Sequence, residues 1–280
     1  MDNELASSPA RIHDRYRRLV MFDLAEEFEL GFFLSYYRNF AIPHLAATLA
    51  GTGEIEARPA KRSFDTAIVM YELIEHGFEG DRGRAMVDLL TRVHKGVPGS
   101  GEDFRYVLTT LLVVPIRFCD EFGRRATTAE EKQSAVDFYQ ELASRMGIEG
   151  LTNVYEDSET FLDGYEMRHA RRSDAGDKLM TSTMGLFAER MPRVAERLIP
   201  QGLAFMIDDP RVASALNLPK PSRPLHGILR GALKARGMQL RRRPARVTSR
   251  FTPGKAGSSV YPGGYQLSDL GPINHAPQSR

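Results

Sequence analysis

The sequence contains no tryptophan and only one cysteine, Cys119, among its 280 residues. A single cysteine cannot form an intramolecular disulfide, and it supplies no Cys-x-x-Cys pair for zinc or redox chemistry. The first residues, MDNELASSPARIHDRYRRL, are charged and lack the apolar run of a secretory signal. We therefore expect a cytoplasmic protein without a disulfide framework.

Long apolar runs and phosphate-binding motifs are also missing. The most apolar segment, residues 106–118, falls short of the roughly 20 residues that cross a bilayer, so it is typical of a buried helix. No GxGxxG or GxxxxGK[ST] motif is present to cradle a nucleotide phosphate, and no GxSxG elbow indicates a serine hydrolase.

No run of alternating apolar and polar residues indicates a strand. Apolar residues instead recur every three or four positions, between proline, glycine and capping residues. We predict an all-α fold, with a single multi-helical domain over residues 1–240 and an extended, mobile, basic tail over residues 241–280. The predicted helices cover about residues 59–76, 81–96, 102–123, 128–146, 158–172, 175–190, 204–216 and 222–236.

Local signals mark several of these helix ends. Asp81 is a candidate N-cap for the helix over residues 81–96, which has Thr91 and His94 on its apolar face. Thr128 and Glu131 predict a capping box, and the proline- and glycine-rich residues 98–101 form a loop before the helix that starts at about residue 102.

The net charge of +2 conceals an uneven distribution. Residues 220–280 hold 12 Lys or Arg and one acid, Asp269, so the preceding part of the chain carries 26 minus 35, or −9. Such a tail favours peripheral contact with an anionic membrane surface. Its most basic stretch, LKARGMQLRRRPARVTSR, lacks the aromatic residues that would stack on nucleic-acid bases, so no nucleic-acid partner is expected. The alternative is that the arginines pack back on the acidic body. The basic residues in question are Lys234, Arg236, Arg241, Arg242, Arg243 and Arg246.

Most of the histidines have an ordinary structural interpretation. A Glu-x-x-His pattern occurs once, from Glu166 to His169, whereas a di-iron helical bundle needs two copies. His44 is typical of a first helical turn, and His76 is typical of a cation at a helix C-terminus. We place neither of these last two histidines at a cofactor.

Two helical faces carry polar groups where apolar ones are expected. Arg62 and Thr66 are four residues apart, on the face that Val69 and Leu73 continue. A buried guanidinium or hydroxyl requires a partner, and Arg62 alone would most often form an ion pair with a nearby carboxylate. His94 lies on the apolar side of the next helix, where a neutral imidazole can offer one ring nitrogen to a metal. Taken alone, His94 would be a core histidine or one stabilised by the helix dipole.

In combination, these residues resemble the signature of the rubber oxygenase (latex-clearing protein) and MpaB-type oxygenase family. The R-x-x-x-T of Arg62 and Thr66 is followed 28 residues later by His94 in RVHKGV. Several other segments resemble family segments in order and spacing. They are FAIPHLAATLAGTGEIEARPAKR, DFRYVLTTLLVVPIRFCDEFGRRATTAEE, ELASRMGI and the closing YPGGYQLSDLGP.

The resemblance implies a helical protein that binds haem b in a globin-like core and uses dioxygen to cleave isoprenoid double bonds. His94 would be the iron ligand, with Arg62 and Thr66 on the opposite side of the haem. Asp65 stands where latex-clearing proteins have a lysine just before the matching threonine. A distal lysine ligand is therefore not expected. Asp65 could pair with Arg62 or accept a proton, and its alternative is an ordinary helix-surface carboxylate.

The leading hypothesis is a haem-dependent oxygenase that acts on a hydrophobic, isoprenoid-like small molecule. Its site would comprise His94 as metal and cofactor ligand, with Arg62, Thr66 and Asp65 as the catalytic candidates. The rival hypothesis is a non-catalytic helical scaffold of the same fold that binds a lipid surface. In the scaffold, the polar residues would be satisfied by hydrogen bonds among themselves.

Overall fold

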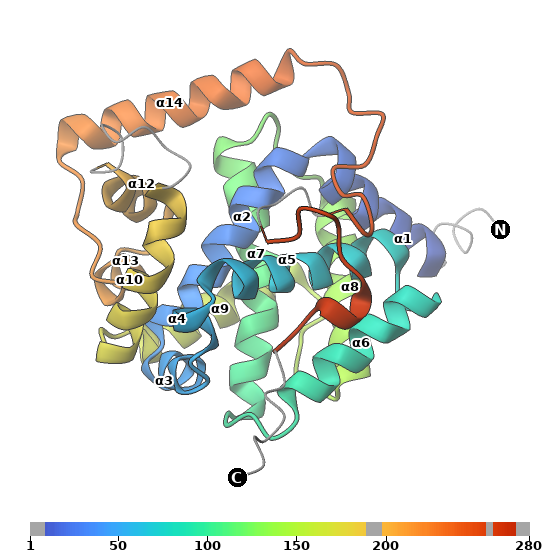
Figure 1. Ribbon diagram of the computed structural model, residues 1–280. Helices are drawn as coiled ribbons and strands as arrows, with labels where there is room; N and C mark the ends of the chain where they lie inside the picture. The colour runs from blue at the N-terminus through green and yellow to red at the C-terminus, as the bar shows by residue number, and fades with distance from the viewer. Residues whose placement is uncertain (1–8, 189–197, 256–259, 273–280) are drawn as a thin grey trace, which may run out of the picture.

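Helices follow one another through the part of the chain that the computed structural model describes, residues 9–188, 198–255 and 260–272 (Figure 1). No β-strand occurs in these ranges, only an isolated bridge between Thr252 and Lys255. The prediction of a single all-α domain is confirmed. The α-helices are α1 (Pro9–Arg18), α2 (Ala25–Arg38), α3 (Pro43–Gly51), α4 (Glu54–Ala57), α5 (Pro59–His76), α6 (Asp81–His94), α7 (Gly101–Phe122), α8 (Ala129–Met146), α9 (Tyr155–His169), α10 (Asp174–Ala188), α12 (Ile199–Met206), α13 (Pro210–Ala215) and α14 (Arg223–Arg241). A π-helix (Leu19–Asp23) and two 3₁₀ turns, η3 (Asn39–Ala41) and η4 (Leu267–Asp269), complete the set.

Helix boundaries coincide with the sequence signals that predict them. Pro59 opens α5, where its missing N–H has no helical partner to lose. Thr128 and Glu131 form the predicted capping box at the start of α8, each binding the other's backbone N–H. Gly77 and Gly147 end α5 and α8 with φ of 69° and 68°, a conformation that glycine adopts without steric cost.

Three local expectations are wrong. The residue that caps α6 is Gly80, and Asp81 is the first residue of the helix. Thr91, expected on the inner face of α6, is exposed. The helix predicted over residues 204–216 is divided into α12 and α13, because Pro210 starts a new helix whose first turn is capped by Asp209 through Arg211 N at 2.7 Å.

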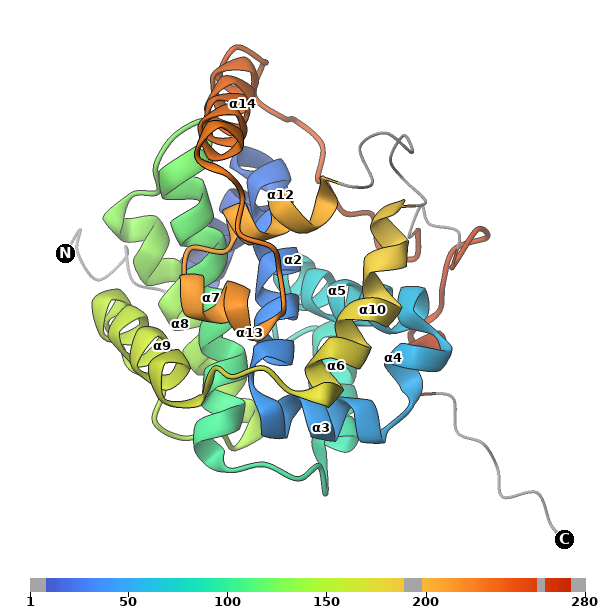
Figure 2. The ribbon, with the colours of Figure 1, turned by 90° about the vertical axis from the view of Figure 1, so that its left-hand side faces the viewer.

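Helices α2 and α7 form the centre of the molecule (Figure 2). They approach so closely that a Cβ added to Gly31 would lie 2.3 Å from Pro115 Cα. One turn away, Ser35 Oγ donates to Thr110 O at 2.8 Å and ties the two helices together. The remaining helices pack around this pair and bury a continuous apolar core.

Helix α14 and the residues after it wrap around the outside of this body (Figure 1). Residues 242–255 and 260–272 form no long helix, and they pack against the body through Phe251, Tyr265 and Leu270, which are buried.

Several arginines of α14 and of the tail contact the acidic body. Arg246 pairs with Glu26 at 2.8 Å, and Arg230 pairs with Glu121 at 3.0 Å. Arg241 donates to Arg124 O at 2.7 Å. In the described part of the chain, no helix is both long and apolar enough to span a membrane.

Candidate functional site

A cavity of about 310 Å³ lies inside the helical domain, at the low end of the ~300–1,000 Å³ typical of small-molecule sites. Helices α3, α5, α6, α7 and α8 supply most of its wall, and Gly271 and Pro272 add a segment from far along the sequence. The polar lining residues include Arg62, Thr66 and His94. The apolar lining residues include Val69, Met70, Leu89, Leu90, Val93, Phe104, Val107, Leu108, Leu111, Leu142, Met146 and Ile148.

Arg62 and Thr66 face this cavity together from α5. The Arg62 guanidinium donates to Thr66 Oγ1, and the Thr66 hydroxyl donates to Arg62 O at 3.0 Å. The nearby carboxylates pair elsewhere, Glu72 with Arg82 and Glu75 with Arg17. Arg62 thus lines the cavity beside an ordered hydroxyl and does not pair with either of these two carboxylates.

His94 lines the same cavity from the last turn of α6. Its Nδ1 lies 2.7 Å from Leu90 O, and because a carbonyl only accepts, Nδ1 carries the proton and Nε2 is left with a lone pair. Phe104 packs edge-on against the ring at a centroid distance of 5.9 Å. Burial lowers the pKa of His94, the bond to Leu90 O opposes this, and the charge of Arg62 lowers the pKa further. His94 is thus a neutral imidazole, the form that binds a metal.

Asp65 differs from both sequence interpretations. It is 3% exposed, so it is not a helix-surface carboxylate, and it pairs with Lys61 rather than with Arg62. It contributes to the cavity wall, yet both of its oxygens accept hydrogen bonds from residues near the C-terminus.

Two further polar residues at the cavity were not expected from the sequence. The side-chain amide of Asn39 donates to Ser35 O at 3.1 Å, while its Oδ1 is buried without a hydrogen-bond partner among the described residues. Asp103 accepts from Ser100 N at 2.7 Å and completes the capping box of α7. The proline- and glycine-rich loop before α7 indicated a helix start, but nothing in it pointed to a cavity.

Glu166, from the isolated Glu-x-x-His pattern, is fully buried and does not face a metal site. Its carboxylate forms a two-pronged pair with Arg38 at 2.7 and 2.6 Å and accepts from Tyr106 at 3.0 Å. Within residues 9–188, 198–255 and 260–272, no three His, Cys, Asp or Glu side chains gather closely enough to hold a metal ion. Sites that need several protein ligands thus have no candidate in those ranges.

The other two histidines considered in the sequence have structural partners. His44 Nε2 lies 2.8 Å from Asp103 Oδ1, and His76 lies 3.4 Å from Glu72. Neither histidine lines the cavity.

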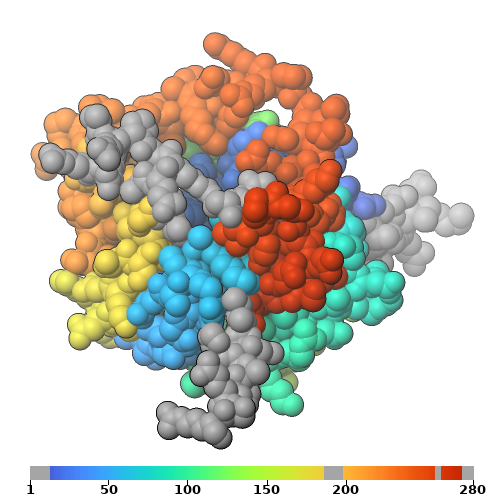
Figure 3. Space-filling model, in the orientation of Figure 1, coloured from blue at the N-terminus to red at the C-terminus, as the bar shows by residue number. Residues whose placement is uncertain are grey.

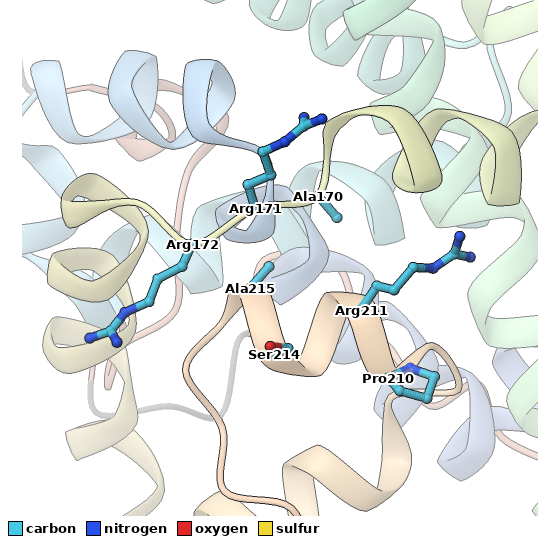
Figure 4. Close-up of a pocket in the computed structure, with 7 residues that line it drawn as sticks. All are labelled: Ala170, Arg171, Arg172, Pro210, Arg211, Ser214 and Ala215. Atoms are coloured by element: carbon cyan, nitrogen blue, oxygen red, sulfur yellow. The ribbon is translucent and has the colours of Figure 1, made fainter.

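A second hollow lies between the turn after α9 and helix α13 (Figure 4). Three arginines line it, but Figure 4 shows that their guanidinium groups point in different directions. Arg172 pairs with Asp177 at 2.9 Å and Arg211 with Asp209 at 2.7 Å. The hollow therefore lacks convergent positive charge, and the cavity that contains His94 is the better candidate site.

Comparison with known proteins supports the family resemblance seen in the sequence. Residues 29–247 match the family model described as "ER-bound oxygenase mpaB/B'/Rubber oxygenase, catalytic domain". The chain is 23% identical over 257 residues to "ER-bound oxygenase mpaB'" of Penicillium brevicompactum, covering 84% of this chain and 60% of the relative. It is 24% identical over 191 residues to "ER-bound oxygenase mpaB" of Penicillium roqueforti (strain FM164), covering 62% of this chain and 64% of the relative. The chain thus spans less than two thirds of either relative.

Proposed function

Because the chain belongs to the ER-bound oxygenase mpaB/B' and rubber oxygenase catalytic-domain family, we propose that it is a haem b-dependent oxygenase acting with dioxygen on a hydrophobic small molecule. The observation that carries this proposal is that Arg62, Thr66 and His94 line one cavity, although they come from two helices. Had these residues lain on separate surfaces, the proposal would have had no site.

The residues at the cavity fit a haem. A haem iron requires only one axial side chain from the protein, and His94 is a neutral imidazole with one nitrogen free. The largely apolar walls suit a porphyrin ring. When bound, haem would supply the activation of dioxygen.

The chain's own residues orient the His94 imidazole and hold a positive charge at the cavity. The bond from Nδ1 to Leu90 O fixes both the ring orientation and the tautomer of His94, as a second-shell partner does for a metal ligand. Thr66 holds the Arg62 guanidinium in one position, so that its positive charge is already in place to stabilise negative charge that develops in the cavity. The apolar lining keeps water out and strengthens that interaction.

The substrate class follows from the same lining. Leucine, valine, methionine and phenylalanine side chains offer contact area but few hydrogen bonds, which favours an apolar chain over a sugar or a nucleotide. An isoprenoid-like molecule fits this description and the resemblance to the family.

The first prediction concerns the axial ligand. Purified protein titrated with haem is expected to develop a Soret band, and His94→Ala is expected to shift or abolish that band, because the axial nitrogen is lost. Arg62→Ala is expected to retain haem, since it removes a pocket charge and not the ligand. Absorption spectroscopy measures both.

The matched control is His76→Ala, which removes another histidine from the last turn of a helix but outside the cavity. It should leave the Soret band unchanged. A band of equal position and intensity in His94→Ala would show that the ligand assignment is wrong.

The rival function is a helical scaffold that contacts lipid. It is favoured by helix α14, where Ile228 and Met238 are 67% and 58% exposed on a basic helix. It is disfavoured by the arginines of α14 and of the tail that already pair with the protein body. If no Soret band forms in the wild-type protein, the scaffold becomes the better assignment.

A further inference from the structure

Residues 260–272 lie beyond residues 29–247, which match the family model, yet Gly271 and Pro272 at their end form part of the cavity wall. The segment crosses α5 and reaches α6 on the face shown in Figure 1. In the space-filling view it covers the surface between the light-blue residues around α4 and the teal residues of α6 (Figure 3). Gly271 and Pro272 stand at its inner end, against the cavity.

Asp65 holds this segment in place. Its Oδ1 accepts from the Tyr261 hydroxyl at 2.6 Å, and its Oδ2 accepts from Gly271 N at 3.0 Å. Lys61 pairs with the same carboxylate at 2.5 Å and donates to Asp269 O at 3.0 Å and to Gly271 O at 3.1 Å. Two neighbouring side chains of α5 thus bind both hydroxyl and backbone groups of one short segment.

Further along α5, a second set of contacts holds this segment and the chain before it. Glu72, which is fully buried, accepts a hydrogen bond from the hydroxyl of Tyr265, within the segment. The Phe251 ring stacks on Tyr71 at a centroid distance of 5.5 Å, and Ser249 donates to Glu75 at 3.0 Å. Glu72 therefore anchors the middle of the wall, whereas Asp65 anchors the end that reaches the cavity.

The close fit against α6 depends on glycine. Gly271 has a φ of +96°, which side-chain-bearing residues rarely adopt. An added Cβ would lie 3.3 Å from Leu89 Cδ1 and 3.9 Å from Val93 Cγ1, both on the cavity lining. The backbone itself therefore closes the cavity at this point.

We propose that Asp65 is a positioning residue whose carboxylate, together with Lys61, holds residues 261–272 as a removable wall that limits entry of hydrophobic ligands into the cavity. This role gives a physical use to an acid at the position where latex-clearing proteins have a lysine. It also explains why both carboxylate oxygens are engaged, which leaves Asp65 poorly placed to accept a proton from a substrate. The inference concerns the cavity alone and does not require that haem be bound.

The second prediction tests this wall by thiol accessibility in the haem-free protein. Val93→Cys places a thiol on the cavity lining beside Gly271, and its rate of modification by 5,5′-dithiobis(2-nitrobenzoate) is followed by peptide mass spectrometry. Adding Asp65→Asn removes the charge that Lys61 pairs with and one of the two acceptor oxygens. Adding Tyr261→Phe removes the hydroxyl that donates to Asp65. Either change is expected to speed modification of the introduced thiol about tenfold. The milder Tyr261→Phe keeps the test usable if Asp65→Asn fails to fold.

Two controls separate wall opening from unfolding. Cys119 is fully buried in the core, and burial raises its pKa well above the usual range, so it should stay unmodified while the wall opens. Tyr106→Phe removes a tyrosine-to-carboxylate bond elsewhere, at Glu166, and should leave the rate at position 93 unchanged. Equal rates with and without Asp65→Asn and Tyr261→Phe, or Cys119 reacting in step with the introduced thiol, would overturn the proposal. Both outcomes are measured in the haem-free protein, so they are independent of the Soret band that tests the proposed function.

Discussion

At the scale of single residues, the buried ion pair of Arg38 and Glu166 shows that two charged side chains can lie in the core without a signal in the sequence. Arg38 is 1% exposed, and burial opposes its charge, but Glu166 and then Asp208 raise its pKa well above the ordinary value. Asp208 pairs with it at 2.5 Å. In the sequence, Arg38 has the appearance of a surface cation in the last turn of a helix, because its partners lie 128 and 170 positions away.

The third prediction follows from that pair. Glu166→Gln removes the charge that balances a buried guanidinium, so the free energy of unfolding should fall by about 3–5 kcal/mol in urea denaturation. Glu141→Gln, which breaks the more exposed pair with Arg145, should cost about 1 kcal/mol or less. Similar losses in the two variants would mean that the buried pair contributes no more than an exposed one.

The candidate site illustrates both the reach and the limit of sequence reasoning. Arg62, Thr66 and His94 were grouped from their spacing and family resemblance, and the structure has them around one cavity. Asp65 could not be interpreted correctly, because its partners Tyr261 and Gly271 follow it by roughly 200 residues and helical periodicity reports only local neighbours.

At the scale of elements, the crossing of α2 and α7 depends on a missing side chain. Within a helix, a glycine is predicted only to lower stability, so Gly31 gave no sequence signal of a contact. The need for glycine at position 31 becomes evident only in the fold, where Pro115 of α7 lies against it. Helix ends, by contrast, were predictable, because capping and proline effects act within a few residues.

The fourth prediction compares two glycines. Gly31→Ala would force α2 and α7 apart and should lower the free energy of unfolding by about 1–3 kcal/mol or more. Gly51→Ala meets no atom within 4 Å and should be neutral or stabilise by up to about 1 kcal/mol. Urea midpoints of the two variants measure the difference, and a tolerated Gly31→Ala would contradict the close crossing.

At the scale of the whole molecule, the basic tail neutralises the acidic body. Arg246 and Arg250 pair with Glu26 and Glu29 at 2.8 and 2.6 Å. Burial alone would raise the pKa of Glu26, but the bond from Arg246 and the charge of Arg124 outweigh burial and lower it to about 2. The uneven distribution of charge can be seen in the sequence, whereas these ion pairs can be identified only from the fold.

The fifth prediction is that acid destabilises the protein in two steps. Burial lowers the pKa of His13 and His94, so the unfolded chain binds more protons and stability falls as the pH drops below about 6.5. Glu26 and Asp103 have pKa values of about 2, so their contribution is present above about pH 4 and is lost as the pH falls toward 2. Urea midpoints at pH 7.5, 5.5 and 3 measure both steps.

The control for this pH dependence is His13→Gln, whose amide can still donate to Ile74 O. It should weaken the first step and leave the second unchanged. An unaltered first step would show that His13 does not contribute.

The wall of the cavity also has a consequence for how the protein is made. Asp65 and Gly271 are separated by 206 positions, and a ribosome delivers the chain from the N-terminus. Helices α5, α6 and α7 can therefore pack while residues 260–272 are still unsynthesised, so the nascent protein has an apolar hollow open on that side. On the entry route that we propose, a ligand that arrives during translation would meet no wall there, whereas one that arrives afterwards would have to displace the contacts of Asp65 and Lys61.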